Sequence, residues 1–94
     1  MAGYKLGRLA EIKLAEIYNY SFDTFGEHQA DGYILSLHDA FARLAEMPRL
    51  GRKWRRWRRH EHGEHVIFYD IAADGIFIIR IFHRSENIVA RMKF

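Results

Sequence analysis

The sequence predicts an α+β fold in which a helical hairpin packs on a three- to four-stranded antiparallel sheet, in the order β-α-α-β-β-β. Three observations support this. Residues 10–47 carry apolar side chains at helical spacing, interrupted around Gly26. Residues 64–71 and 76–82 are rich in β-branched and aromatic residues, which favour strands. A chain of 94 residues can bury one modest core, so we expect residues 1–94 to form a single domain.

The N-terminal half accounts for one strand and two helices. Residues 4–9 fit a short first strand. Residues 10–25 fit a helix whose apolar stripe comprises Ile12, Ala15, Tyr18, Phe22 and Phe25. Gly26 can adopt the left-handed conformation that ends a helix, and a one-residue connection implies antiparallel helices. Residues 27–47 fit the second helix, with a buried face made of Ala30, Tyr33, Ile34, Leu37, Phe41, Leu44 and Ala45.

The C-terminal half predicts strands. Residues 57–61 and 64–71 fit two of them, separated by a turn at His62-Gly63. The sequence Asp74-Gly75 favours a tight hairpin turn, because both positions tolerate a positive φ angle. Residues 76–82 are almost wholly apolar, which is expected of a central strand covered on both faces.

The composition excludes several classes of protein. The absence of cysteine excludes disulfides and thiolate zinc sites, and it fits a reducing, cytoplasmic location. The first ten residues lack the apolar core of a signal peptide. No apolar run approaches the roughly 20 residues that span a bilayer, so we expect no membrane association.

The charge is concentrated in one place. Residues 49–59, called here the arginine-rich segment, contain seven cations and no acid. The rest of the chain has eight cations against twelve acids, a net charge of −4. Such a segment is a candidate docking site for an acidic partner or for nucleic acid.

The arginine-rich segment also contains two large aromatic residues. Arginine can pair with a carboxylate or phosphate through two hydrogen bonds, and tryptophan can anchor in a pocket. If the segment is extended, Arg55 and Trp57 lie on one face and Trp54 on the other. An alternative, compatible with partner binding, is that Trp57 packs into the core and the arginines are solvated. The predicted partner-binding residues are Arg52, Trp54, Arg55, Arg56, Arg58 and Arg59.

Three histidines lie close together in the sequence, namely His60, His62 and His65. On a strand, the first two would point to the same side. Zinc needs three or four ligands in a tetrahedral array, and the sequence fixes no fourth ligand. We therefore predict no metal site.

Three stretches of the sequence resemble a known family, and they occur in the same order as in that family. The first runs from Gln29-Ala30 through Tyr33-Ile34 to Pro48-Arg49-Leu50-Gly51. The second is Gly63-Glu64-His65-Val66-Ile67-Phe68-Tyr69, and the third runs from Gly75-Ile76 through Ile78-Ile79-Arg80-Ile81-Phe82-His83. They resemble the second helix with its exit, and the last two strands, of ParE-type toxins in the RelE/ParE superfamily. The similarity covers nearly the whole chain.

The resemblance implies the toxin of a type II toxin–antitoxin system. It implies inhibition of DNA gyrase by protein contact, with no enzymatic activity and no cofactor. It also implies neutralisation by a ParD-like antitoxin, whose helix would enter a groove beside the helices and whose acidic tail would cover the arginine-rich segment. An acidic antitoxin tail is expected at the arginine-rich segment rather than DNA, because the acidic remainder of the chain would repel phosphate. No sequence-specific nucleic-acid binding is expected, because no DNA-reading motif is present.

The alternative is a ribosome-dependent mRNA endonuclease of RelE type, because one fold serves both activities. RNA cleavage requires a base, an acid and cations around the phosphate. By the resemblance, His83 and Arg80 are retained. Val66 stands where several nuclease relatives carry an arginine, and Arg84 follows His83 where they carry a tyrosine. We therefore predict no catalytic residue, with His83 and Arg80 as the candidates under the nuclease alternative.

Overall fold

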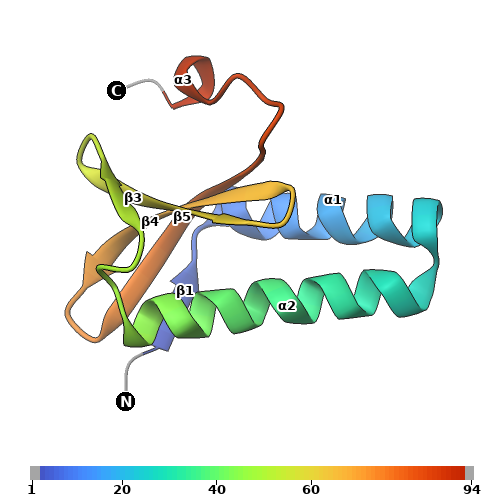
Figure 1. Cartoon of the computed structure of the whole chain (residues 1–94), viewed down its shortest axis with the longest axis horizontal. Coiled ribbons are helices and arrows are strands. Elements are labelled where there is room, and N and C mark those ends of the chain that lie inside the picture. Colours follow the sequence, from blue (N-terminus) through green and yellow to red (C-terminus); the bar gives the residue numbers. More distant parts are fainter. Residues whose placement is uncertain (1–2, 93–94) are drawn as a thin grey trace.

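Residues 3–92 of the computed structural model form two long helices on one face of a five-stranded sheet (Figure 1). In chain order, the elements are β1 (Gly3–Leu6), α1 (Arg8–Phe25), α2 (Glu27–Glu46), β2 (Arg52–Trp54), β3 (Trp57–His62), β4 (His65–Ala72), β5 (Gly75–His83) and α3 (Ile88–Arg91). Gly26, at a φ angle of 95°, joins α1 to α2 as the sequence predicts.

The strand order in the sheet is β1-β5-β4-β3-β2. The pairs β2–β3, β3–β4 and β4–β5 are antiparallel, whereas β1 pairs with β5 in parallel. The apolar strand β5 is therefore internal, and the short strands β1 and β2 form the two edges. The α+β class and the helical hairpin on a sheet are confirmed, but the sheet has five strands instead of three or four and one pair is parallel.

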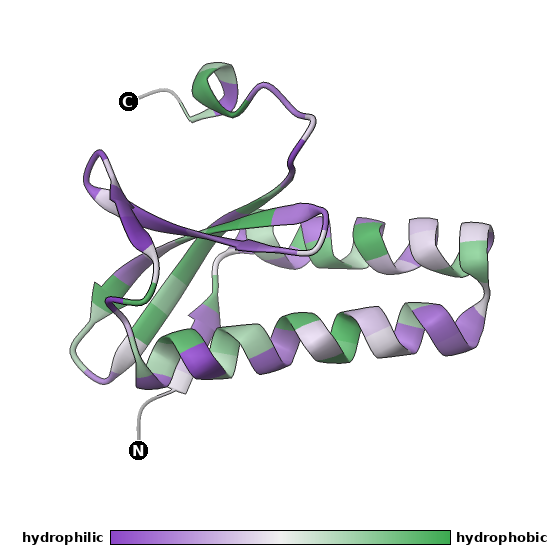
Figure 2. Cartoon of the chain, in the orientation of Figure 1, coloured by the Kyte–Doolittle hydropathy of each residue, from purple (hydrophilic) through white to green (hydrophobic). Residues whose placement is uncertain are grey.

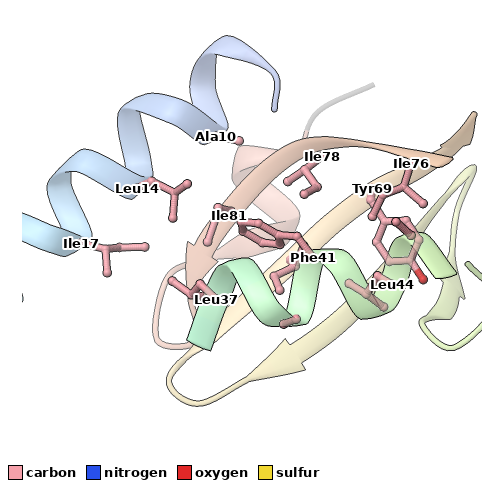
Figure 3. Packing of buried hydrophobic residues seen from close by; sticks show 13 residues of the cluster. Ala10, Leu14, Ile17, Leu37, Phe41, Leu44, Tyr69, Ile76, Ile78 and Ile81 are labelled. Carbon is pink, nitrogen blue, oxygen red and sulfur yellow. The ribbon is translucent and has the colours of Figure 1, made fainter. Parts of the chain in front are cut away.

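The main core lies between the helices and the sheet (Figure 3). From α1 it takes Ala10, Leu14 and Ile17, and α2 supplies Leu37, Phe41 and Leu44. The sheet contributes side chains that include Ile67, Tyr69, Ile76, Ile78 and Ile81.

A second apolar cluster covers the opposite face of the sheet. It consists of Trp57, Val66, Phe68, Phe82 and Met92, with Trp54, Ile79 and Ile88 packed against it. The segment after β5 folds back over this face, so that α3 lies on the side away from the long helices (Figure 1). As expected of a central strand, β5 is covered on both faces.

The apolar residues predicted to form the buried face of the first helix are the wrong ones. Ile12, Phe22 and Phe25 are 45%, 44% and 56% exposed, and the buried positions of α1 are Ala10, Leu14, Ile17 and Ser21. Both sets have helical spacing, and the sequence alone favours the bulkier one. In Figure 1 the end of the hairpin near Gly26 projects beyond the sheet, so its aromatic residues have no sheet to pack against.

Candidate partner-binding surfaces

An open groove of about 1130 Å³ lies between the projecting parts of α1 and α2 and the β3–β4 turn. Its apolar wall includes Ile17, Tyr20 and Phe25 of α1 and Tyr33 of α2. Tyr20 is 66% exposed and Phe25 is 56% exposed. Large apolar side chains gathered at a concave surface mark an interaction site. Its volume is just above the range of roughly 300–1000 Å³ typical of small-molecule pockets, so it can also receive a polypeptide segment.

A hydrogen-bonded cluster forms the sheet end of the groove. The Tyr33 hydroxyl is hydrogen-bonded to His65 Nδ1 at 2.6 Å, and the His65 ring meets the His83 ring edge to face at 5.3 Å. Burial, reinforced by the nearby charge of His83, lowers the pKa of His65 to about 4. His65 is therefore neutral at pH 7, and a neutral imidazole has one nitrogen that donates and one that accepts a hydrogen bond. This cluster gives the role of His65 that the sequence could not supply.

Charged residues form the rim beside this cluster. Lys13 of α1 contacts Glu86 at 2.8 Å, and Glu86 also accepts from the His83 backbone N–H at 2.8 Å. Arg91 of α3 contacts the same carboxylate at 3.3 Å. Burial alone would raise the pKa of Glu86, but these hydrogen bonds and positive charges outweigh it and lower the pKa. Glu86 therefore ties α1, the end of β5 and α3 together as an ionised group.

The arginine-rich segment lies away from the groove, since none of residues 49–59 lines it. Its centre is a β-hairpin in which Trp54 pairs with Trp57 across a two-residue turn, Arg55-Arg56. The two tryptophans therefore share one face of the sheet, which corrects the alternation predicted for one continuous strand. The cause is Arg55, whose φ angle of 56° reverses the chain. Figure 2 shows most of β3 as hydrophilic, whereas β5 is largely hydrophobic.

The predicted partner-binding residues divide into two groups. Arg52, Arg55 and Arg56 are exposed. Trp54 is half-buried against Phe68, with ring centroids 5.0 Å apart. The other two arginines are half-buried as well: Arg58 donates to the Gly51 carbonyl at 2.7 Å, and Arg59 contacts Glu61 at 3.2 Å. As the sequence suggested, Trp57 is in the core, with 3% exposure.

The structure separates the two residues of the nuclease alternative. Arg80 pairs with Phe68 on β4 and stacks on Phe82 at 4.5 Å, which places it on the α3 face of the sheet. His83 pairs with His65 and lines the groove on the helix face. Because β5 projects Arg80 and His83 to opposite faces of the sheet, the two side chains do not meet at one phosphate. Val66, which stands where several nuclease relatives carry an arginine, is in the core and is 1% exposed.

Two of the three neighbouring histidines are hydrogen-bonded, and residues 3–92 hold no group of three or more potential metal ligands. His62 Nε2 lies 3.0 Å from the Ser36 hydroxyl, and His65 is held by Tyr33. Within the same residues, no helix combines the length and the apolar character needed to cross a bilayer.

Comparison with known proteins identifies the family. A family model described as the ParE toxin of a type II toxin–antitoxin system, parDE, matches residues 4–88. The chain belongs to the ParE toxin family. It is 33% identical to Toxin ParE1 of Caulobacter vibrioides, over 98% of this chain and 99% of that one. It is 31% identical to Toxin ParE1 of Mycobacterium tuberculosis, over 90% of this chain and 92% of that one.

The fold agrees with this membership. A chain of the chromosomal ParDE toxin–antitoxin system from P. aeruginosa superimposes with a TM-score of 0.73, covering 88% of this chain and 96% of that one at 20% identity. This chain is thus a ParE-type toxin of a type II system, as the resemblance implied. The groove's charged rim was missed by sequence reasoning, because Lys13 and Glu86 are 73 residues apart.

Proposed function

We propose that this ParE-family toxin inhibits DNA gyrase by protein contact and that a ParD-like antitoxin neutralises it. Family membership supports both statements. The separation of Arg80 from His83 across β5 is the observation that favours a contact inhibitor over an RNA-cleaving enzyme. The fold presents protein-sized surfaces, which suit a macromolecular target.

We assign the antitoxin to the groove between α1, α2 and the β3–β4 turn. An amphipathic helix places apolar anchors at i, i+3, i+4 and i+7, which suits an elongated apolar groove. The exposed Tyr20 and Phe25 can make apolar contacts with the antitoxin, and Lys13 and Glu64, which also line the groove, can make polar ones. Because the cations of residues 49–59 lie outside the groove, that segment is proposed as a second, separate contact surface.

Purified gyrase tests the target. Adding the toxin should inhibit supercoiling or accumulate cleaved DNA, and adding the antitoxin should reverse this. In cells, expression should stall replication and trigger the DNA-damage response while transcripts remain intact. Transcripts cut within minutes of induction, with cutting lost in His83→Ala, would instead establish the nuclease alternative.

The variant Phe25→Glu tests whether the antitoxin binds in the groove. It places a charge against the apolar wall and should weaken antitoxin binding at least tenfold in titration calorimetry, a change of about 1.4 kcal/mol. Leu35→Glu is the matched control, because Leu35 is 64% exposed on α2 and does not line the groove. Equal affinities for the two variants would place the antitoxin elsewhere.

A further inference from the structure

The fold separates the charges of the molecule. The two long helices carry seven acids against three cations, a net charge of −4. Residues 49–63 carry seven cations and one acid, Glu61. In Figure 1 the β2–β3 turn and the α1–α2 turn lie at opposite ends of the molecule. Asp23, Glu27 and Asp31 adjoin the α1–α2 turn and are therefore at the other end from the arginine-rich segment, whereas Glu46 ends α2 close to it.

Several of these cations are held in place at the surface. Arg55 stacks on Trp54 with its guanidinium carbon 4.6 Å from the ring centroid, and its Nη1 donates to the Met92 carbonyl at 3.3 Å. Arg52 pairs with Arg59, and Lys53 pairs with Arg58, across the hairpin. Adjacent residues of a strand point to opposite faces, so Arg52 and Lys53 place charge on both sides of the ribbon. Glu61 lies 3.9 Å from Arg52 and 3.2 Å from Arg59 and offsets part of their charge, whereas Lys53 and Arg58 depend on screening by solvent or by an anionic partner.

We propose that the β2–β3 hairpin binds the phosphate backbone of double-stranded DNA, without reading its sequence. The contacts are made by the exposed residues Arg49, Arg52, Lys53 and Arg55. Because these residues lie outside the groove, DNA and an antitoxin occupy different surfaces. The inference goes beyond the proposed gyrase inhibition and does not depend on it, since it concerns the toxin and DNA alone.

The geometry favours duplex DNA over other polyanions. The major groove of B-form DNA admits a two-stranded β-ribbon, and phosphates line both of its edges. Because β3 stays paired with β4, the hairpin would enter the groove with its outer strand β2 and its turn. Arg52 and Lys53 of β2 point to opposite faces and can then reach the two phosphate rows. The major groove of duplex RNA is too deep and narrow for this approach. An extended acidic peptide would have to add to the edge strand β2, which offers a ladder of only three residues.

Fluorescence anisotropy with a labelled 20-base-pair DNA duplex tests the proposal through its salt dependence. Each phosphate contact contributes about 0.9 to the slope of log K against log salt concentration, so four contacts give a slope of about −3.6. Affinity should then fall by about a hundredfold between 50 and 200 mM salt. The triple variant R52Q/K53Q/R55Q should keep one contact and lose only about fourfold over the same range.

A matched variant controls for net charge. The triple variant K5Q/R8Q/R84Q removes three exposed cations outside the hairpin and should keep the slope of the unmodified chain. Circular dichroism checks that both variants fold. If Arg55→Gln disturbs the turn, R52Q/K53Q alone should still reduce the slope by about 1.8.

Three results would overturn the inference. The first is an equal loss of slope in the hairpin variant and its control, which would mean that only net charge matters. The second is equal or tighter binding of an RNA duplex of the same sequence. The third is binding of a poly-glutamate peptide of equal charge at least as tightly as DNA, which would assign the hairpin to an acidic protein.

Discussion

Replacing Tyr69 by phenylalanine should destabilise the chain by about 1.5–3 kcal/mol. Tyr69 is fully buried, and its hydroxyl accepts from the Gly51 N–H at 2.9 Å and donates to the Pro48 carbonyl at 2.7 Å. The hydroxyl thus fixes the loop that leads from α2 into the arginine-rich segment. Each lost hydrogen bond costs about 0.5–1.5 kcal/mol, and a buried N–H left without a partner costs about 1–3 kcal/mol. The ring remains, so no large cavity adds to the loss.

Thermal unfolding followed by circular dichroism measures this effect. For a domain of this size, 1 kcal/mol shifts Tm by about 4–8 °C, so Tm should fall by at least about 6 °C. Hydrogen exchange should show faster exchange of the Gly51 amide than of the β4–β5 amides. Tyr20→Phe is the control, because Tyr20 is 66% exposed and its hydroxyl makes no hydrogen bond within residues 3–92. If Tyr69→Phe and Tyr20→Phe melt at the same temperature, the loop is not held by this hydroxyl.

Two further predictions concern His65 and Arg55. The lowered pKa of His65 means that it stabilises the fold fully above pH 6.5 and loses this contribution as the pH falls from 6.5 to about 4. After allowance for its half-buried position, the loss in the free energy of unfolding is about 1–2 kcal/mol. Urea unfolding should therefore depend on pH between 6.5 and 4, and His65→Gln should reduce this dependence. The same pH dependence in His65→Gln as in the unmodified chain would refute the lowered pKa of His65. Arg55 has a positive φ angle, which costs a residue with a side chain about 1 kcal/mol and which glycine adopts freely. Arg55→Gly should therefore raise Tm by a few degrees. A fall in Tm would show that the stacking of Arg55 on Trp54 outweighs the backbone strain.

Long periodic segments could be predicted from the sequence. The buried face of α2 matches the expected one at Ala30, Leu37 and Phe41. The strands β4 and β5 were predictable because their β-branched and aromatic residues flank a turn signal at Asp74-Gly75. The turn itself is one residue earlier than predicted, because Ala72 pairs with Gly75 and the two central residues are Ala73 and Asp74. In these segments the local preference and the tertiary packing agree.

Other features depend on contacts that the sequence does not show. Strand β2 has three residues, too few for a periodic pattern to be visible. The pairing of Trp54 with Trp57 follows from the turn at Arg55, and arginine has no preference for a positive φ angle. On α1 two apolar stripes compete, and only the position of the sheet decides that Leu14 is buried and Phe22 is exposed. The helix was therefore predictable, whereas its buried face was not.

The exposed stripe of α1 and the hairpin arginines share a physical cause. A sheet covered on one face by two long helices and on the other by α3 leaves two parts uncovered: the projecting end of the helical hairpin and the outer edge at β2–β3. The first is apolar, because Phe25 and Tyr20 lack a sheet to pack on. The second is cationic, and its charges prevent the free edge from pairing with another sheet. A toxin built this way can offer one surface for neutralisation and keep a second, chemically different one for another macromolecule.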